Sequence, residues 1–336
     1  MAEPVPGLDL DRFGAWLVSA VPGAGGEVTA SVIAGGKSNL TYDVTDGTSR
    51  WIVRRPPLGH VLATAHDMGR EYRVMSALQG SAVPVPHMFA FCDDPEVIGA
   101  PFYVMERIDG TAFTRAAQLE ALGADRTRTI STRMVDTMAD LHAVVPDAVG
   151  LGDFGRPEGF LGRQVERWKK QLDSSHTRDL PAADELYRRL SADVPPDGAV
   201  GIVHGDFRLD NVLVDAADRP AAVIDWEMAT LGDPLTDLAL MLVYGRMAAA
   251  AGAIVADANL APGFLTEAEI VERYASRSDR DLSRFGFYLG LAAFKLTGIL
   301  EGIHYRYQHG QTVGPGFDRI GDLVDPLLQA GLDALD

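Results

Sequence analysis

Four polar residues at fixed spacing form the strongest chemical pattern in the sequence. His204 and Asp206 are followed by Asn211, and Asp225 ends an apolar run further on. A carboxylate such as Asp206 can hold an acceptor hydroxyl and take its proton, while an amide oxygen and a second carboxylate can hold Mg²⁺ on nucleotide phosphates. The pattern therefore indicates phosphoryl transfer, with Asp206 as base and Asn211 and Asp225 as metal ligands.

The residues around this set differ from the protein-kinase pattern, which reads H-R-D-L-x-x-x-N followed by D-F-G. Here Gly205 replaces the arginine, and Trp226-Glu227 follow Asp225. Only six residues then separate Asp225 from the stretch 232–237. A protein kinase carries its activation segment in this interval, and six residues are too few to hold one. A folded protein substrate therefore lacks its docking segment, and the spacing favours a small-molecule hydroxyl acceptor.

Two further residues of the segment have supporting roles. His204 is expected to orient the loop by hydrogen bonding rather than to do chemistry, and Arg208 joins the candidate catalytic residues. For Arg208 and its neighbour Asp210, a structural role and a place at the edge of the substrate remain equally open.

A glycine-containing stretch between two expected strands is the candidate phosphate cover. Residues 35–39 read Gly-Gly-Lys-Ser-Asn, and their backbone N–H groups and the serine hydroxyl could wrap phosphates. The stretch is not G-x-G-x-x-G, so an ordinary hairpin turn is the alternative. The candidate nucleotide ligands here are Gly36, Ser38 and Asn39.

A strand, a helix and a hinge supply the remaining nucleotide contacts. Ile52 and Arg54 share one face of a strand, because side chains alternate along it. Ile52 is expected to cover the adenine and Arg54 to reach the phosphates, paired with Glu71 of the following helix. Arginine stands where a protein kinase has lysine, and an exposed strand arginine is the alternative. Backbone groups near Glu106 and Ile108 are expected to bind adenine at the hinge.

Hydrophobic periodicity predicts the elements that position these residues. The first part of the chain is expected to hold helices over 8–21 and 68–78 and strands over 28–34, 40–45, 50–54, 88–92 and 102–105. The second part is expected to hold helices over 127–144, 160–172 and 182–190, strands over 201–204, 212–214 and 222–224, and a helical region over 235–332 broken at Pro262-Gly263 and Gly314-Pro315-Gly316.

This order predicts an α+β, bilobal architecture. Residues 1–105 form an antiparallel sheet lobe with one helix packed against it, 106–110 form a hinge, and 111–336 form a larger, mainly helical lobe with the catalytic loop. The helical lobe is expected to bind the acceptor through 155–195 and 245–320. Its aromatic residues could line a pocket, although core packing is the alternative for most of them: Trp168, Tyr244, Tyr288, Tyr305 and Tyr307.

Composition narrows the partners. The chain of 336 residues has a formal net charge of −17, which argues against nucleic acid and anionic membranes. Cys92 is the single cysteine, so it is expected to be a buried core residue, and a reducing cytoplasm is the expected location. No apolar run approaches the roughly 18 residues of a spanning helix, and no signal-peptide pattern is present. The sequence does not indicate an oligomeric state.

The chain resembles the aminoglycoside phosphotransferase and choline kinase superfamily, small-molecule kinases with the protein-kinase-like fold. The catalytic motifs H-G-D-x-x-x-x-N and I-D-W-E carry the resemblance, which covers nearly the whole chain. Within the superfamily, the chain is most similar to kinase domains fused to some acyl-CoA dehydrogenases. That similarity rests on 54–57, 65–67, 70–72, 150–157, 170–171, 177–181 and 229–234.

The resemblance implies the use of ATP and Mg²⁺, with Asp206 as base and Asn211 and Asp225 as metal ligands. Arg54 lies within the subgroup's pattern. The fused partner implies hydroxylated acyl chains, including their CoA esters, as acceptors. The acidic net charge disfavours anionic CoA at long range, but local basic residues can offset it: Arg163, Arg167, Lys169 and Lys170.

Two other functions remain open. One is an aminoglycoside, amino-alcohol or sugar kinase. The other belongs to a different class, a nucleotide-binding sensor without turnover.

Overall fold

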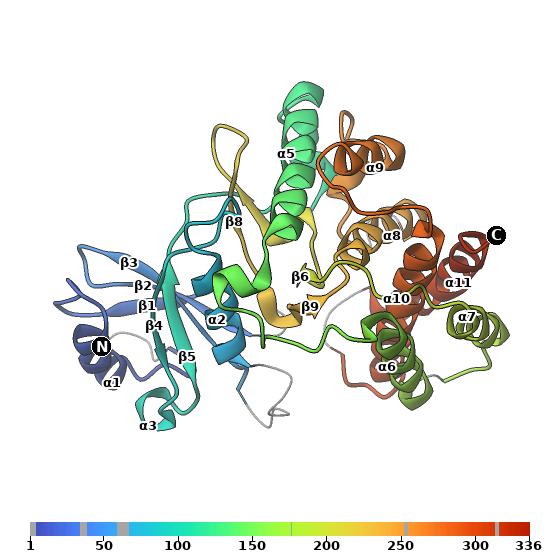
Figure 1. Ribbon diagram of the computed structural model, residues 1–336. Helices are drawn as coiled ribbons and strands as arrows, with labels where there is room; N and C mark the ends of the chain where they lie inside the picture. Colours follow the sequence, from blue (N-terminus) through green and yellow to red (C-terminus); the bar gives the residue numbers. More distant parts are fainter. Residues whose placement is uncertain (1–4, 34–38, 59–66, 176, 252–254, 313–315) are drawn as a thin grey trace. The chain divides into compact units, whose positions relative to one another are not determined.

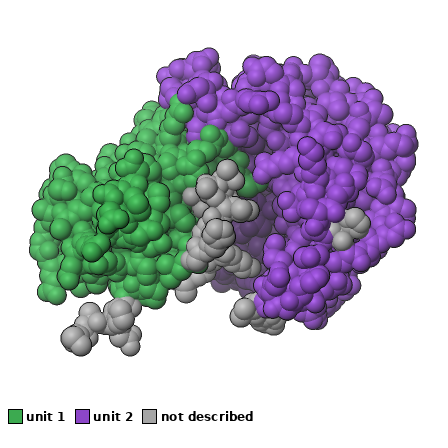
Figure 2. Space-filling view, turned by 90° about the horizontal axis from the view of Figure 1, so that it is seen from below, with its two compact units in different colours: residues 1–110, 221–229 green, residues 111–220, 230–336 purple. Residues whose placement is uncertain are grey.

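The computed structural model describes residues 5–33, 39–58, 67–175, 177–251, 255–312 and 316–336. The chain forms two compact units. Figure 1 colours the ribbon by residue number, and Figure 2 gives each unit its own colour. Unit 1 comprises 1–110 and 221–229, and unit 2 comprises 111–220 and 230–336. The α+β class predicted from the sequence is confirmed.

Unit 1 is built on a five-stranded antiparallel sheet with the order β1-β2-β3-β5-β4. The strands predicted from periodicity are present, with shifts of one or two residues at some ends. Their bounds are β1 Thr29–Val32, β2 Leu40–Thr45, β3 Arg50–Arg55, β4 Met88–Cys92 and β5 Phe102–Glu106. The helices are α1 Leu10–Ala20, α2 Met68–Leu78 and a short α3, Pro95–Ile98, that the sequence analysis did not anticipate.

Strand β3 divides its side chains between two environments, as strand alternation requires. Trp51 and Val53 join the hydrophobic core that α1 covers. Arg55 lies on that side too, where its Nη1 donates to the carbonyl of Ile98 at 2.8 Å. Arg54 lies on the other side and pairs with Glu71 of α2. Cys92 packs in the α1-side core, as expected.

The segment 221–229 belongs to unit 1, although the sequence analysis grouped it with the helical lobe. The Val223 N–H donates to the Pro84 carbonyl at 2.8 Å, and Arg70 Nη2 donates to the Ala229 carbonyl at 3.3 Å. The segment contains most of β8, Pro220–Val223, and the 3-10 turn η3, Trp226–Met228. These contacts bring Asp225 to the sheet that carries Arg54.

Unit 2 is mainly helical, and α10 is its central helix (Figure 1). Helix α10 packs against α6, α7, α8 and α11. The helices are α4 Ala116–Glu120, α5 Ala124–Ala143, α6 Phe160–Ser175, α7 Pro181–Ala192, α8 Leu235–Ala251, α9 Glu267–Ala275, α10 Phe285–Gln308 and α11 Val324–Asp333. The 3-10 turns of this unit are η1 Pro146–Val149, η2 Leu209–Asn211, η5 Ala258–Leu260 and η6 Phe317–Leu323.

The predicted break at Pro262-Gly263 falls between α8 and α9. Of the second predicted break, Gly314 and Pro315 lie outside the described residues.

By length and composition, α10 could cross a membrane, and in the described residues it is the one helix that meets this test. The sequence analysis expected no run of this kind. In the fold, 72% of the most apolar window of α10 is buried. Its apolar surface therefore packs against the neighbouring helices.

Two short strands hold the start of the catalytic loop. β6, Gly201–Val203, pairs antiparallel with β9, Thr230–Gly232, a strand the sequence analysis missed. Gly201 and Gly232 face each other in this pair. A Cβ on Gly232 would lie 2.7 Å from the ring atoms of Phe160. The close packing of α6 against this strand pair therefore requires glycine at 232.

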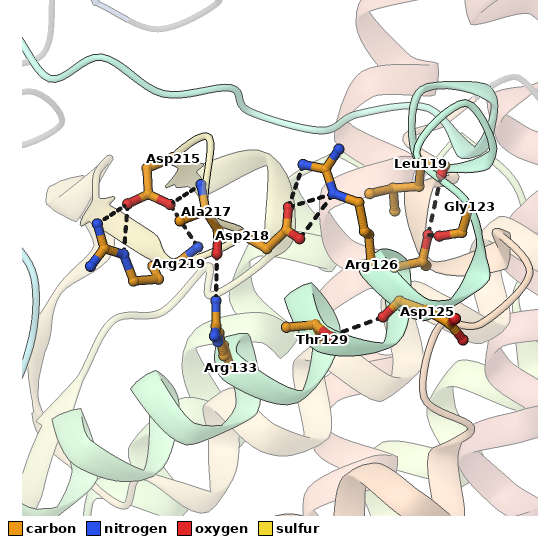
Figure 3. Close-up of polar contacts among 11 residues, drawn as sticks. Leu119, Gly123, Asp125, Arg126, Thr129, Arg133, Asp215, Ala217, Asp218 and Arg219 are labelled. Carbon is orange, nitrogen blue, oxygen red and sulfur yellow. Dashed lines mark hydrogen bonds and ion pairs between the residues drawn. The ribbon is translucent and has the colours of Figure 1, made fainter.

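The chain beyond the catalytic loop is fastened to α5 (Figure 3). After β7, Val212–Val214, the turn 215–219 approaches the start of α5. Arg126 makes a two-pronged contact with the Asp218 carboxylate at 2.6 to 3.1 Å. Arg133 Nη1 donates to the Ala217 carbonyl at 2.7 Å. β7 is thus held at its far end by contacts to a long helix.

We expect Gly232→Ala to lower the free energy of unfolding by about 1–3 kcal/mol, because the rigid Phe160 ring leaves no space for a methyl group. Gly162→Ala is the matched control. Gly162 lies in α6 with no atom within 4 Å of the added Cβ. The free energy of unfolding of the Gly162→Ala protein should therefore rise by about 0.5–1 kcal/mol. Urea denaturation measures both changes. Equal effects of the two substitutions would contradict the packing argument.

Candidate functional site

An arginine in unit 1 joins two carboxylates that the sequence places far apart. Arg54 Nη1 lies 3.2 Å from Glu71 Oε2, and its Nη2 lies 2.9 Å from Asp225 Oδ1. The Tyr103 hydroxyl donates to Glu71 Oε2 at 2.9 Å. Arg54 is only 8% exposed, so the alternative of an exposed strand arginine is wrong. The predicted pairing of Arg54 with Glu71 is present.

Asn39 extends this network. Its Nδ2 donates to Glu71 Oε1 at 3.2 Å and to Glu227 Oε2 at 3.3 Å. Its buried Oδ1 accepts no hydrogen bond from the described residues. The amide nitrogen of Asn39 is therefore engaged with carboxylates, and a phosphate contact through this nitrogen stays a prediction. Gly36 and Ser38, the other two predicted phosphate ligands, lie outside the described residues.

Burial and charge act together on the ion pair. Burial alone would lower the pKa of Arg54, but Tyr103, Glu71 and Asp225 outweigh it and raise that pKa above its ordinary value. Burial raises the pKa of Glu71 to about 7, against the opposing effects of Arg54 and of the Tyr103 hydrogen bond. Arg54 is thus held as a buried cation between Glu71 and Asp225.

The predicted adenine contacts lie in β3, at the last residue of β5 and just after β5. Ile52 is buried on the same side of the sheet as Arg54. The Glu106 N–H donates to the His87 carbonyl at 2.8 Å, so this donor is already used. Ile108 follows the end of β5 and is partly exposed. Adenine binding at Ile52, Glu106 and Ile108 stays a prediction.

In unit 2, one carboxylate anchors the catalytic loop. Asp237, at the start of α8, accepts the His204 N–H through Oδ2 at 2.6 Å and the Gly205 N–H through Oδ1 at 2.8 Å. The Asp206 N–H donates to His204 Nδ1 at 3.2 Å. Gly205 has φ +85°, a conformation that glycine adopts readily. Backbone geometry is therefore fixed on the two residues directly before Asp206.

His142 of α5 supports this anchor from the core. Its Nε2 lies 3.4 Å from Asp237 Oδ2, and its Nδ1 lies 2.8 Å from the Tyr274 hydroxyl. Burial lowers the pKa of His142, although Asp237 opposes the shift. Burial would raise the pKa of Asp237, but His142 and the backbone N–H of His204 hold it below its usual range. Asp237 is thus an ionised acceptor for the loop.

Within the loop, Asn211 turns its amide toward Asp206. Asn211 Nδ2 donates to the Asp206 carbonyl at 2.9 Å and to Asp206 Oδ2 at 3.0 Å. Its Oδ1 is left without a hydrogen bond to the described residues. The buried Asp206 Oδ1 likewise accepts no hydrogen bond there. The cation nearest to Asp206 Oδ1 is the Arg208 guanidinium, whose Nε lies 3.4 Å away.

Arg208 is tied to the loop and to α8. Its Nη2 donates to Asp210 Oδ2 at 2.7 Å, and its Nε lies 3.4 Å from Asp206 Oδ1. The guanidinium stacks over the Tyr244 ring at 4.4 Å from the centroid. Burial raises the pKa of Tyr244, and the Asp206 carboxylate adds to the shift. Arg208 thus places positive charge beside Asp206.

The two units each assemble part of the predicted site. Unit 1 brings together Arg54, Glu71, Asn39 and Asp225, and unit 2 brings together His204, Asp206, Arg208 and Asn211. The two predicted metal ligands, Asn211 and Asp225, therefore belong to different units.

Asp237, His142 and Lys295 were missed by the sequence analysis. Lys295 of α10 donates from Nζ to the Gly205 carbonyl at 2.7 Å. The sequence contains a feature that could have pointed to Lys295 and to Asp237. Lys295 is the one basic residue between 285 and 305, and Asp237 is an acid in the first turn of the apolar helix α8. Nothing in the sequence singles out His142, because its partners lie 95 and 132 positions away.

The donor set fits Mg²⁺ in its chemistry. The metal prefers hard oxygen ligands and is commonly held by one or two carboxylates together with substrate phosphates. Asn211 offers its unengaged Oδ1, and Asp225 offers a carboxylate of which Oδ1 is paired with Arg54. Among the residues the structure describes, no group of three or more His, Cys, Asp or Glu forms a metal cluster. A site completed by nucleotide phosphates agrees with this donor set.

Comparison with known proteins places the chain in a family. Residues 29–275 match the model of the APH phosphotransferase enzyme family. Acyl-CoA dehydrogenase family member 11 of Gallus gallus is 33% identical over 322 residues, covering 92% of this chain and 40% of that protein. The chain thus spans less than half the length of this relative.

The similar solved structures include the following two. A protein of Ralstonia eutropha JMP134, assigned to the aminoglycoside phosphotransferases, has a TM-score of 0.85 at 32% identity, covering 97% of this chain and 98% of that one. Aminoglycoside phosphotransferase APH(4)-Ia, solved with AMP-PNP and hygromycin B, has a TM-score of 0.60 at 15% identity, covering 95% and 98%. The resemblance inferred from the motifs is confirmed: the chain belongs to the APH phosphotransferase enzyme family and has its kinase-like α+β fold.

Proposed function

We propose that the protein transfers the γ-phosphoryl group of ATP to a hydroxyl of a small molecule, with Mg²⁺ as the metal. The observation that carries the proposal is the anchored loop of unit 2. Asp237 fixes the backbone before Asp206, and Asn211 is oriented by Asp206 itself. Such rigidity agrees with a catalytic base, because a phosphoryl acceptor must be held in line with the leaving group.

In the proposed step, the acceptor oxygen forms a bond to the γ-phosphorus while the bond from that phosphorus to the leaving oxygen of ADP breaks. The hydroxyl proton passes to Asp206, whose Oδ1 accepts no hydrogen bond from the described residues. Arg208 Nε lies 3.4 Å from this oxygen and holds the carboxylate in place for the transfer. Bound Mg²⁺ would neutralise charge on the phosphates, held by Asn211 and Asp225.

For unit 1 we propose nucleotide binding through Arg54. The guanidinium is buried and positioned by Glu71, and it already pairs with the anionic Asp225. Phosphate oxygens, like carboxylate oxygens, are anionic acceptors that a guanidinium can bind in a bidentate manner. The complex of APH(4)-Ia with AMP-PNP supports nucleotide use in this fold. Ile52, Glu106 and Ile108 remain the proposed adenine contacts.

For the acceptor we propose a hydroxylated acyl compound, including CoA esters, because the chicken relative is an acyl-CoA dehydrogenase family member. The hygromycin B complex of APH(4)-Ia keeps aminoglycosides as the alternative, together with amino alcohols and sugars. A nucleotide sensor is the alternative of another class. The proposed location is the cytoplasm, with no nucleic-acid or membrane partner.

We expect Asp206→Asn to reduce phosphoryl transfer by roughly 10²–10⁴-fold, the usual contribution of a general base. ADP release from Mg²⁺·ATP is measured against hydroxyacyl-CoAs, hydroxy acids, aminoglycosides, amino alcohols and sugars. Asp218→Asn, which alters a surface ion pair of the same unit, is the control and should retain wild-type turnover. Unchanged turnover in Asp206→Asn would refute the assignment. Nucleotide binding without ADP release for any acceptor would favour the sensor.

Asn211→Ala and Asp225→Ala should each weaken Mg²⁺·ATP binding by roughly tenfold or more, because each removes one oxygen ligand of a charged site. Calorimetric titration with ATP is run with Mg²⁺ and again with chelator. The loss for Asn211→Ala should disappear in chelator, since Asn211 acts only through the metal. An Asn211→Ala defect of equal size without Mg²⁺ would argue against the metal role.

Asp237→Asn should lower kcat while leaving the affinity for Mg²⁺·ATP unchanged, because an amide nitrogen would face the backbone N–H of His204 or Gly205. The expected loss is roughly 10- to 100-fold, similar to losing a ligand-orienting partner in other sites. Steady-state kinetics and calorimetry separate the two effects. A parallel loss of ATP affinity, or an unchanged kcat, would contradict the positioning role of Asp237.

A further inference from the structure

Helix α6 presents a row of basic side chains along an open groove. Arg163, Arg167 and Lys170 line this groove, which has a volume of about 470 Å³. The rest of its lining is polar, from Glu166, Gln171 and Ser174. The chain as a whole carries a net charge of −17. The groove therefore carries positive charge on a protein whose net charge is negative.

None of these three cations has an acidic partner among the described residues, and Arg163 donates to the backbone carbonyls of Arg156 and Glu158. Neither Arg167 nor Lys170 takes part in an ion pair there, although both are exposed. Their neighbour Lys169 differs, because it lies within 4.0 Å of carboxylate oxygens of Asp173 and Asp184. The charges of Arg167 and Lys170 are therefore not offset by an ion pair within the described residues. Glu166, the one acid of the groove, accepts a hydrogen bond from Tyr187.

A tryptophan connects the groove to the catalytic loop. The Arg167 guanidinium lies 5.3 Å from the centroid of the Trp168 ring, and Lys295 Nζ of α10 lies 5.5 Å from the same centroid. The Nζ also donates to the Gly205 carbonyl at 2.7 Å. Two cations therefore share one indole, and one of them touches the residue directly before Asp206.

The electrostatics of this pair favour an anion. Burial lowers the pKa of Lys295; the carboxylates of Asp206 and Asp237 oppose this shift, whereas Arg167 adds to it. Arg167 and Lys295 thus repel each other across the ring. A bound anion would relieve this repulsion and would be held by charge-assisted hydrogen bonds, which are stronger than neutral ones.

We propose that Arg167 and Lys170, with Lys295 at the catalytic end, bind an anionic group of the acceptor while its hydroxyl lies at Asp206. The acceptor is then a hydroxylated compound with a carboxylate or a phosphate, rather than a polycationic aminoglycoside. This inference rests on the proposed phosphoryl transfer and narrows its acceptor class. A carboxylate and a phosphate present the same chemistry to these cations, so the experiment separates them.

Binding is measured by calorimetry without ATP, which keeps the test independent of turnover. The probes share one hydroxyacyl group: 3-hydroxybutyryl-CoA carries phosphates, 3-hydroxybutyrate carries a carboxylate, and the N-acetylcysteamine thioester is uncharged. The variants are Arg167→Gln and Lys170→Gln, and the matched control is Lys169→Gln on the same helix. Lys295 is left unchanged, because its contact with Gly205 positions the loop.

We expect at least one anionic probe to bind the wild-type protein and the uncharged thioester to bind much more weakly. Each variant should weaken the anionic probe roughly tenfold, as loss of one charged hydrogen bond implies, while Lys169→Gln should not. Binding of the CoA ester alone would identify the phosphate as the anion, and binding of the free acid would identify the carboxylate. Raising the salt concentration should weaken the same interaction.

Three results would overturn the inference: equal binding of charged and uncharged probes, no binding of either anionic probe, or wild-type affinity in both variants. ADP release with the same probes is measured separately. Charge-dependent binding without ADP release would leave the anion site standing and remove the proposed phosphoryl transfer. ADP release with aminoglycosides, and not with the anionic probes, would keep the transfer and remove the anion site.

Discussion

The contact between the Asp237 carboxylate and two backbone N–H groups is the interaction on which the candidate site depends. It fixes His204 and Gly205, and Gly205 is also held through its carbonyl by Lys295. A loop that follows a three-residue strand has few hydrogen bonds of its own. Because both faces of one peptide segment are bound by charged side chains, Asp206 is presented by a fixed backbone. A buried carboxylate is costly unless its oxygens have polar partners, and here His142 Nε2 lies 3.4 Å from Asp237 Oδ2 as a further partner.

In unit 1, charged side chains likewise hold one buried residue in place. Arg54 is a buried cation that Glu71 and Tyr103 hold from the helix and sheet. The segment 221–229 brings Asp225 to it, although this segment follows the catalytic loop in sequence. The sheet unit is thus completed by residues from the middle of the chain. This arrangement places the carboxylate of Asp225, which follows an apolar run, beside Arg54 of β3.

The sequence predicts candidate site residues where the chemistry requires a fixed order of residue types. Asp206, Asn211 and Asp225 were recognisable because phosphoryl transfer needs an acid, an amide and an acid at short spacing. Hydrophobic periodicity also located most helices and strands. It missed β9, which has three residues and is recognisable only by its pairing with β6. It also could not group 221–229 with unit 1, or find His142 and Lys295, because those contacts are made by residues distant in sequence.

The central claim is that an acceptor hydroxyl takes the γ-phosphoryl group. Phosphorus NMR of the products, formed from Mg²⁺·ATP and the acceptor that binds most tightly, tests it directly. The account predicts a phosphate monoester of the acceptor in equal amount to ADP. Release of inorganic phosphate without a monoester, or no consumption of ATP, would contradict it.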